Sequence, residues 1–385
     1  MHIGFDVSQT GSNKAGCGYF AYSMANALID LAPENLYSLY PSFGDFYFDF
    51  LMPWKNSWRG RGISFGPRHF FRAASANFWN NANAELLLGT PDIIHSNNFW
   101  CFKRLQSSRL IYTFYDMGFA INPSWTSESN RVGCFDGVFH SAMSADWVVA
   151  ISKASRDHYL NMFPHFPESR IRIIYPCSRF ANAALMGVRP RRLKGVVAGR
   201  YWLNVGTIEP RKNQRRLMQA YARYINLGGE PMPMVLAGGK GWLMGDFHEY
   251  LDELGIADKV IFTGYISDEE LIWLYQNCYA NLYPSLFEGF GLPVLEGMQF
   301  GAPTLASSST SLPEVVGNSA VLLDPENVEE WAQGMAHISK NKGHRDALGQ
   351  CARVQASRFD WRNSAASLLQ LYEEALASPK RMAMQ

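Results

Sequence analysis

The sequence lacks the usual features of secreted, membrane-spanning and nucleic-acid-binding proteins. Its six cysteines lie far apart and form no C-x-x-C pair, which is typical of reduced thiols rather than of a zinc site or a disulfide framework. The first residues, MHIGFDVSQT, carry no secretory signal, and no stretch reaches the roughly 18 uninterrupted apolar residues of a membrane span. A net charge of +1 gives no general attraction to nucleic acid. We therefore expect a cytoplasmic protein, free or at the inner face of a membrane, that binds no nucleic acid.

The chain is long enough for two α/β domains, because 385 residues exceed one ordinary hydrophobic core. It opens with a strand-like run at Met1–Val7, a glycine-punctuated loop at Gly11–Gly18 and a helical pattern at Tyr19–Leu31. Further buried-strand patterns, which alternate with helical patterns such as 154–163, follow at 92–95, 110–114, 147–151 and 171–175. This alternation predicts a parallel sheet in a doubly wound domain.

A basic stretch with Pro and Gly at 186–200 predicts an interdomain linker. Beyond it, strand and helix patterns alternate again, beginning with a strand at 201–205 and a helix at 214–227. We therefore predict an α/β protein of two Rossmann-like doubly wound domains, 1–185 and 201–355, that face one another across a cleft.

Residues 43–79 hold an unusual mixture of aromatic and basic side chains. Phe46 and Trp54, for example, lie among Lys55, Arg59 and similar residues. The mixture suits a peripheral membrane contact or a lipid-linked acceptor. The alternative is an irregular insertion that packs on its own domain, since aromatic residues are ordinary core material.

The most informative motif is EGFGLPVLE, which runs from Glu288 to Glu296. Pro293 is a favoured first residue of a helix, which places residues 289–292 in the loop before it. Glycines there let the backbone approach a ligand, and the N–H groups and helix dipole favour a phosphate. Glu288 can accept hydrogen bonds from sugar hydroxyls, and Glu296 can accept them from the two hydroxyls of a ribose. Alternatively, both glutamates merely favour the helix start electrostatically, which would explain Glu296 but not the whole motif.

With this motif the chain resembles the family-4 retaining glycosyltransferases of the GT-B fold, whose signature is a pair of glutamates within EGFGLPxLE. The similarity covers most of 201–324, including GAPTLAS at 301–307 and SLPEVVG at 311–317. It implies a nucleotide-sugar substrate, with Glu288 and the following amides on the donor sugar and Glu296 on the ribose. The donor-binding residues that it implies in this motif are Gly289, Phe290, Gly291, Leu292 and Glu296.

A second motif, NVGTIEPRKN at 204–213, lies between a strand pattern and a helix pattern. Its Arg211 and Lys212 can stabilise the charge of a departing diphosphate without a metal, although an isolated Arg-Lys pair is more often a solvated surface pair. In the family a lysine stands at the position of Lys212, and an arginine often stands where this chain has Thr207, which the resemblance also assigns to donor binding. The chain has no D-x-D-type motif, and we expect no metal and no cofactor.

The resemblance assigns two further segments to the donor. Tyr265 and Ile266 match the family's base-binding segment at a strand end, for which plain strand-end packing is the alternative. Gly16 and Gly18 match a glycine loop whose amides would reach the donor phosphate.

On the acceptor side, Asp116 matches the aspartate of a family segment that often reads His-Asp, and Tyr115 replaces the histidine. Asp116 is expected to orient the acceptor or the donor sugar. His95 is expected either at the same cleft or as a structural histidine, and Ser152 and Lys153 match a turn that would contact the acceptor. A closing helix at 360–380 is expected to complete the N-terminal domain.

The resemblance implies displacement at the front face of the donor sugar, with Glu288, Lys212, Arg211 and Asp116 as catalytic residues. The SLPEV segment resembles mannosyltransferases that use GDP-mannose, as in O-antigen, lipopolysaccharide and exopolysaccharide assembly. We therefore expect mannose transfer to a saccharide or lipid-linked saccharide. A UDP-sugar-dependent glycosyltransferase, a nucleotide-sugar epimerase and a non-catalytic nucleotide-sugar-binding protein remain alternatives.

Overall fold

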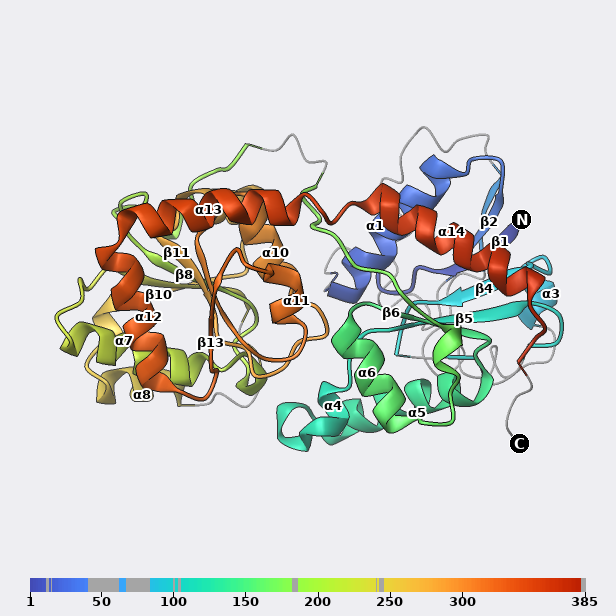
Figure 1. Cartoon of the computed structure of the whole chain (residues 1–385), viewed down its shortest axis with the longest axis horizontal. Coiled ribbons are helices and arrows are strands. Elements are labelled where there is room, and N and C mark those ends of the chain that lie inside the picture. The colour runs from blue at the N-terminus through green and yellow to red at the C-terminus, as the bar shows by residue number, and fades with distance from the viewer. Residues whose placement is uncertain are drawn as a thin grey trace. The chain divides into compact units, whose positions relative to one another are not determined.

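The structure of the protein is a computed structural model that describes residues 1–11, 14, 16–40, 62–66, 84–99, 101–102, 105–181, 186–239, 241 and 246–381. The chain forms two compact units, each a sheet covered by helices (Figure 1). Unit 1 comprises Met1–Pro123, Ser127–Cys177 and Asp360–Gln385, and unit 2 comprises Ser124–Thr126 and Ser178–Phe359. Of the segment 43–79 only residues 62–66 are described, so the membrane or acceptor contact expected there lies outside the described residues.

Unit 1 is built on a seven-stranded parallel sheet with the strand order β3-β2-β1-β4-β5-β6-β7. Every residue of β4 and β6 is buried, as expected where helices cover both faces of a parallel sheet. The strands are β1 (His2–Asp6), β2 (Leu36–Tyr40), β3 (Ile63–Phe65), β4 (Ile93–Ser96), β5 (Arg109–Phe114), β6 (Trp147–Ala150) and β7 (Ile171–Ile173). The helices are α1 (Gly16–Leu31), α3 (Ala84–Leu87), α4 (Gly118–Ile121), α5 (Glu128–Ser144), α6 (Lys153–Met162) and α14 (Trp361–Ala377).

Unit 2 holds a six-stranded parallel sheet with the strand order β10-β9-β8-β11-β12-β13. The chain runs outward from β8 to β9 and β10, then returns to place β11 on the other side of β8, so the order reverses there. The strands are β8 (Trp202–Val205), β9 (Met234–Ala237), β10 (Val260–Gly264), β11 (Ala280–Tyr283), β12 (Thr304–Ser307) and β13 (Val321–Leu323). The helices are α7 (Gln214–Asn226), α8 (Phe247–Glu253), α9 (Asp268–Asn277), α10 (Leu292–Gln299), α11 (Leu312–Val316), α12 (Val328–Lys340) and α13 (Lys342–Ala356).

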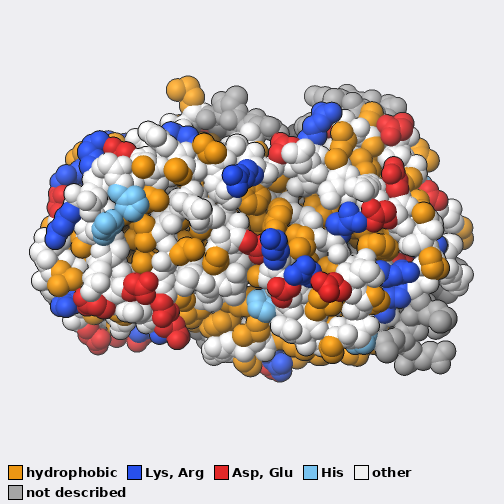
Figure 2. All heavy atoms as spheres, viewed as in Figure 1, with side chains coloured by type: hydrophobic (Ala, Val, Ile, Leu, Met, Phe, Trp, Pro, Cys, Tyr) orange, Lys and Arg blue, Asp and Glu red, His pale blue; other side chains and the backbone are white. Residues whose placement is uncertain are grey.

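Short 3₁₀ helices connect several of these elements. They are η3 (Pro123–Trp125), η4 (Glu168–Arg170), η5 (Arg191–Leu193), η6 (Pro210–Lys212) and η7 (Ala257–Lys259). Among the described residues, no helix is both long enough and apolar enough to cross a bilayer. On the face drawn in Figure 2, basic and acidic side chains are interspersed, in keeping with a net charge of +1.

The predicted fold class is confirmed, since each unit carries a parallel, doubly wound sheet. The unit boundaries differ from the predicted ones: the chain leaves unit 1 after Cys177 and returns at Asp360. Residues 186–200, predicted as the linker, pack on unit 2 because Leu193 and Val196 enter its core, although Met186, Val188 and Val197 are exposed. Leu193 there is 0% exposed, and the N–H of Val188 donates to the carbonyl of Glu269 at 3.0 Å.

The C-terminal helix α14 packs against α1 in unit 1 (Figure 1). Its Tyr372 hydroxyl lies 2.5 Å from Nδ1 of His95, and Nε2 of His95 lies 2.7 Å from Oγ1 of Thr113. Thr113 donates its single hydroxyl proton to Oδ1 of Asn97 at 2.7 Å. Nε2 of His95 must therefore carry the proton that Thr113 accepts, and Nδ1 accepts the proton of Tyr372.

His95 is thus a neutral, buried anchor for α14. It is 0% exposed, and burial lowers the pKa of His95 to about 3. An unfolded histidine takes up a proton near pH 6.5. The stability contributed by neutral His95 is therefore complete above about pH 6.5 and is lost as the pH falls towards 3.

We expect Tyr372→Phe to lower the free energy of unfolding by about 1–3 kcal/mol, because Nδ1 of His95 would remain buried without a donor. The urea midpoint of unfolding measures this change. Tyr265→Phe, whose side chain is 78% exposed, is the control and should change stability by less than about 0.5 kcal/mol. Equal midpoints for Tyr372→Phe and the unmodified protein would contradict the anchoring role.

Candidate functional site

The carboxyl ends of β8 and β11 meet where the strand order of unit 2 reverses. Ligands of open α/β sheets commonly bind at such a point. After β8 the chain turns through η6 into α7, and after β11 it passes through loop 284–291 into α10. Asn213 ties the two connections together: its backbone is left-handed (φ 60°), and its Nδ2 donates to the carbonyl of Pro284 at 3.0 Å. The two predicted motifs therefore lie side by side.

Glu288 is the centre of this arrangement, with only 6% of its surface exposed. Nζ of Lys212 donates to its Oε1 at 2.6 Å, and Nη1 of Arg211 donates to its Oε2 at 3.2 Å. The Tyr283 hydroxyl at the end of β11 also donates to Oε1, at 3.0 Å. Arg211 in addition donates to Oε1 of Glu209 at 2.9 Å. The predicted Arg-Lys pair is therefore held in a charged cluster rather than dispersed on the surface.

The cluster fixes the ionisation state of Glu288. Burial by itself would raise the pKa of this carboxyl. The charges of Lys212 and Arg211, with the hydrogen bond from Lys212, outweigh burial and lower the pKa of Glu288 to about 2. Glu288 is therefore an anion at neutral pH, able only to accept hydrogen bonds.

The start of α10 adds a set of backbone donors beside this cluster. Gly291 is its N-cap, with φ at 102°, and a Cβ at this position would lie 2.5 Å from Cδ2 of Leu312. Only glycine fits there without strain. The N–H groups of a helix's first turn have no partner within the helix and favour an anion. Loop residues are held in place as well, because the N–H of Glu288 donates to Oγ1 of Thr310 at 3.0 Å.

Glu296 lies on α10 and has a different environment. It is 4% exposed; its Oε1 lies 3.0 Å from Nε of Arg179, and its Oε2 accepts from the Tyr275 hydroxyl at 3.3 Å. Here burial dominates over the charge of Arg179, and the pKa of Glu296 is raised to about 7. Sequence reasoning missed both partners, because Arg179 is distant in the chain and Tyr275 reads as an ordinary core residue of α9.

The other predicted donor residues of unit 2 lie at the same sheet edge. Thr207 follows β8, and its carbonyl accepts from Nε2 of Gln214 at 3.0 Å. Tyr265 follows β10 and is 78% exposed. Ile266 next to it packs partly against the core of the unit. Tyr265 is thus open to a ligand and Thr207 is half-buried, while Ile266 also has a packing role.

The remaining predicted residues belong to unit 1. Helix α1 begins at Gly16, and a Cβ on Gly18 would lie 1.9 Å from the carbonyl oxygen of Gln9, so this position admits only glycine. Asp116 follows β5, is half-buried, and its Oδ1 accepts from the N–H of Gly118 at 2.9 Å. Asp116 thereby fixes the turn into α4.

Tyr115, Ser152 and His95 have structural contacts in unit 1. The buried Tyr115 hydroxyl donates to the carbonyl of Asn97 at 2.9 Å, and Ser152 caps α6 by accepting from the N–H of Ser155 at 2.9 Å. His95 anchors α14, as described above. Lys153, by contrast, is exposed, so its charged side chain is accessible to solvent.

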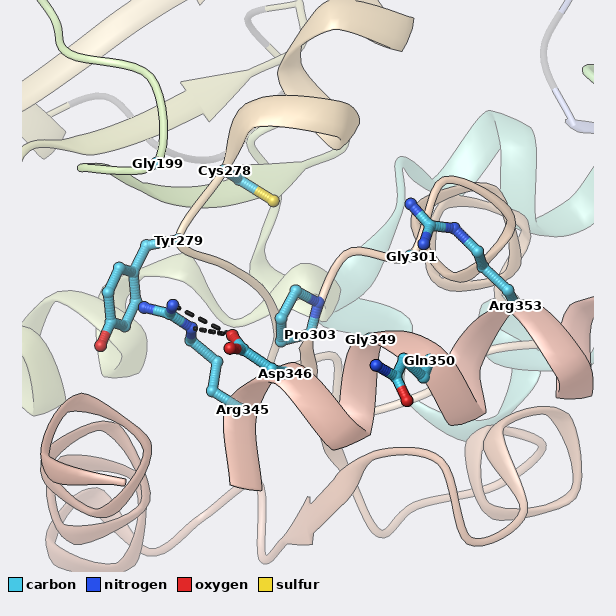
Figure 3. A pocket seen from close by; sticks show the side chains of 10 residues that line it. All are labelled: Gly199, Cys278, Tyr279, Gly301, Pro303, Arg345, Asp346, Gly349, Gln350 and Arg353. Atoms are coloured by element: carbon cyan, nitrogen blue, oxygen red, sulfur yellow. Dashed lines mark hydrogen bonds and ion pairs between the residues drawn. The ribbon is translucent and has the colours of Figure 1, made fainter. Parts of the chain in front are cut away.

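A separate surface pocket of about 390 Å³ lies at the amino ends of β11 and β12, opposite the site just described (Figure 3). Arg345 and Arg353 project from α13 towards it, and Arg345 pairs with Asp346 at 3.1 Å. None of the sequence-predicted site residues lines this pocket.

Comparison with known proteins identifies the family. A family model described as "Glycosyl transferases group 1" matches residues 197–355, which include both motifs. The O-antigen chain mannosyltransferase B of Escherichia coli is 31% identical over 285 residues, covering 73% of this chain and 74% of that protein. The chain belongs to the group 1 glycosyl transferases. A serotype-specific mannosyltransferase, WbdA of Escherichia coli, is 30% identical over 63% of this chain, which spans only 29% of that longer protein.

Solved structures share the fold of this glycosyltransferase across nearly its whole length. Sucrose-phosphate synthase from Thermosynechococcus elongatus has a TM-score of 0.74 at 19% identity, covering 98% of this chain and 100% of that one. Anabaena HepE in complex with UDP and glucose has a TM-score of 0.69 at 20% identity, covering 97% and 100%. These neighbours confirm the predicted GT-B fold.

We expect the stability of the glycosyltransferase to reveal the ion pairs of Glu288. Its lowered pKa contributes stability that is complete above about pH 4.5 and lost as the pH falls towards 2. The difference in free energy of unfolding between the unmodified protein and Glu288→Gln should therefore shrink by up to about 3 kcal/mol over that range. Urea unfolding at several pH values measures it, with Glu329→Gln in an exposed ion pair as control. A difference that stays constant with pH would contradict the assigned ionisation.

Proposed function

We propose that the chain is a retaining mannosyltransferase that moves mannose from GDP-mannose to a saccharide or lipid-linked saccharide acceptor in the assembly of a surface polysaccharide. The observation that carries this proposal is the buried cluster of Glu288, Lys212 and Arg211 at the start of α10. The names of the Escherichia coli relatives support mannose as the transferred sugar.

The chemistry is displacement of the diphosphate by an acceptor hydroxyl on the same face of the sugar. The bond from the anomeric carbon to the phosphate oxygen breaks, and a bond to the acceptor oxygen forms. The departing phosphate oxygen takes the acceptor proton, while the sugar passes through an oxocarbenium-like state. Lys212, Arg211 and the amides at Gly291 and Leu292 stabilise the charge on the diphosphate, because they are fixed in place before it develops.

In this proposal Glu288 holds hydroxyl groups of the donor sugar, and Asp116 of unit 1 orients the acceptor or the donor sugar. Lys212, Arg211 and the amides at the start of α10 donate to the diphosphate in place of a metal ion. We therefore propose that transfer needs no metal ion and continues in the presence of a chelator.

We expect Lys212→Ala to lower kcat by about 10²-fold or more, because a preorganised donor to the leaving group is lost. Steady-state transfer assays measure kcat. Arg215→Ala, which removes an exposed cation paired with Asp246, is the control and should leave kcat unchanged. Near-full turnover by Lys212→Ala would refute its role on the leaving group.

The donor assignment is tested by incubating the protein with radiolabelled GDP-mannose or UDP-sugars and candidate acceptors, with and without EDTA. We expect transfer of mannose with retention at the anomeric carbon, unchanged by EDTA. Transfer from a UDP-sugar alone would favour the alternative suggested by UDP-bound neighbours such as HepE. Isomerisation of the free nucleotide sugar would indicate an epimerase, and binding without turnover would indicate a binding protein.

A further inference from the structure

Arg179 is the second residue of unit 2 after the chain leaves unit 1. Its side chain lies between two helices that begin at the carboxyl edge of the sheet. Nε of Arg179 is 3.0 Å from Oε1 of Glu296 on α10, and its Nη1 is 3.3 Å from Oδ1 of Asp268, the first residue of α9. The side chain of Arg179 is 17% exposed and that of Glu296 is 5% exposed. The pair is therefore well shielded from solvent.

The contacts of Glu296 leave acceptor sites on both of its carboxylate oxygens, which suits a diol. Each oxygen of an ionised carboxylate has about two acceptor sites. Among the described contacts, the guanidinium of Arg179 lies against one side of Oε1 as an ion pair, and the Tyr275 hydroxyl donates a hydrogen bond to Oε2. One acceptor site on each oxygen is thus left for a ligand, which matches two adjacent hydroxyl groups.

We propose that Arg179 is a positioning residue for the ribose of the nucleotide: it favours the charged form of Glu296 and keeps the carboxylate turned so that both oxygens accept hydrogen bonds from the 2′- and 3′-hydroxyls. This inference rests on the proposed function, in which Glu296 binds the ribose. It adds the residue on which that contact depends.

Electrostatics around Glu296 make the dependence measurable. Burial and, to a smaller extent, the charge of Asp268 raise the pKa of the Glu296 carboxyl, whereas Arg179 and the Tyr275 hydroxyl lower it. The net result is a pKa of about 7. Nucleotide affinity should therefore fall as the pH drops below about 7, because the protonated acid loses an acceptor. Without the charge of Arg179, this fall should occur at a higher pH.

The test is isothermal titration of the full chain with GDP between pH 5.5 and 9. Arg179→Met should weaken GDP binding about tenfold or more at pH 7, the loss expected for a charge-assisted contact, and should move the pH dependence upward. Arg179→Lys should restore part of the affinity. The loss of affinity caused by Arg179→Met should vanish with 2′,3′-dideoxy-GDP, because this nucleotide has no ribose hydroxyls that could donate hydrogen bonds to Glu296.

Two controls separate positioning from a structural effect. Arg223→Met removes an exposed arginine paired with Glu329 and should leave GDP affinity unchanged. Arg179→Met in a Glu296→Gln background should cause no further loss if Arg179 acts through Glu296. An equal penalty with dideoxy-GDP, an additive loss in the double variant, or no loss in Arg179→Met would overturn the proposal.

Failure of this inference and failure of the proposed function give different results. If the unmodified protein binds UDP in place of GDP, the donor assignment fails, and the same variants test Arg179 with UDP and its dideoxy analogue. If it binds neither nucleotide, both fail. If it binds a nucleotide that Arg179→Met binds equally well, only the role of Arg179 fails.

Discussion

A carboxylate buried between two cations organises the candidate site of unit 2. Glu288 alone in this position would be strongly destabilising, since a buried charge without a partner costs several kcal/mol. Lys212 and Arg211 offset that cost, and in return the two cations are fixed beside the first turn of α10. In the proposed function, charge that develops on the leaving group would meet donors that need no reorganisation, which is the main physical source of electrostatic catalysis.

The two glutamates of one motif have opposite electrostatic behaviour although a single helix start connects them. Two cations lower the pKa of Glu288 to about 2, whereas burial raises the pKa of Glu296 to about 7. The first carboxylate is therefore charged at neutral pH, whereas the second has a pKa near neutrality and has Arg179 as its cationic partner. The spacing of the two glutamates belongs to the family motif. The ionisation state of each glutamate is set by the side chains that contact it, which lie elsewhere in the sequence.

Sequence reasoning predicted the fold because the signals were local. Alternating strand and helix patterns indicated both parallel sheets, and Pro293 marked the start of α10 to within one residue, since the helix begins at Leu292. It did not find Arg179, since the contact with Glu296 joins distant parts of the chain, nor the packing of residues 186–200, where Leu193 enters the core despite basic neighbours. Whether His95 was structural or at the cleft depended on Tyr372 and Thr113, which only the folded chain places beside it. The roles of the predicted site residues in binding and catalysis stay predictions.

The central claim is that a nucleotide diphosphate binds at the reversal of the second sheet, on Lys212 and the start of α10. A crystal structure of the full chain with GDP tests it most directly. We expect phosphate oxygens within hydrogen-bond distance of Nζ of Lys212 and of the amides of Gly291 and Leu292, and ribose hydroxyls on Glu296. A diphosphate bound elsewhere, for example between Arg345 and Arg353 at the opposite edge of the sheet, would contradict the claim.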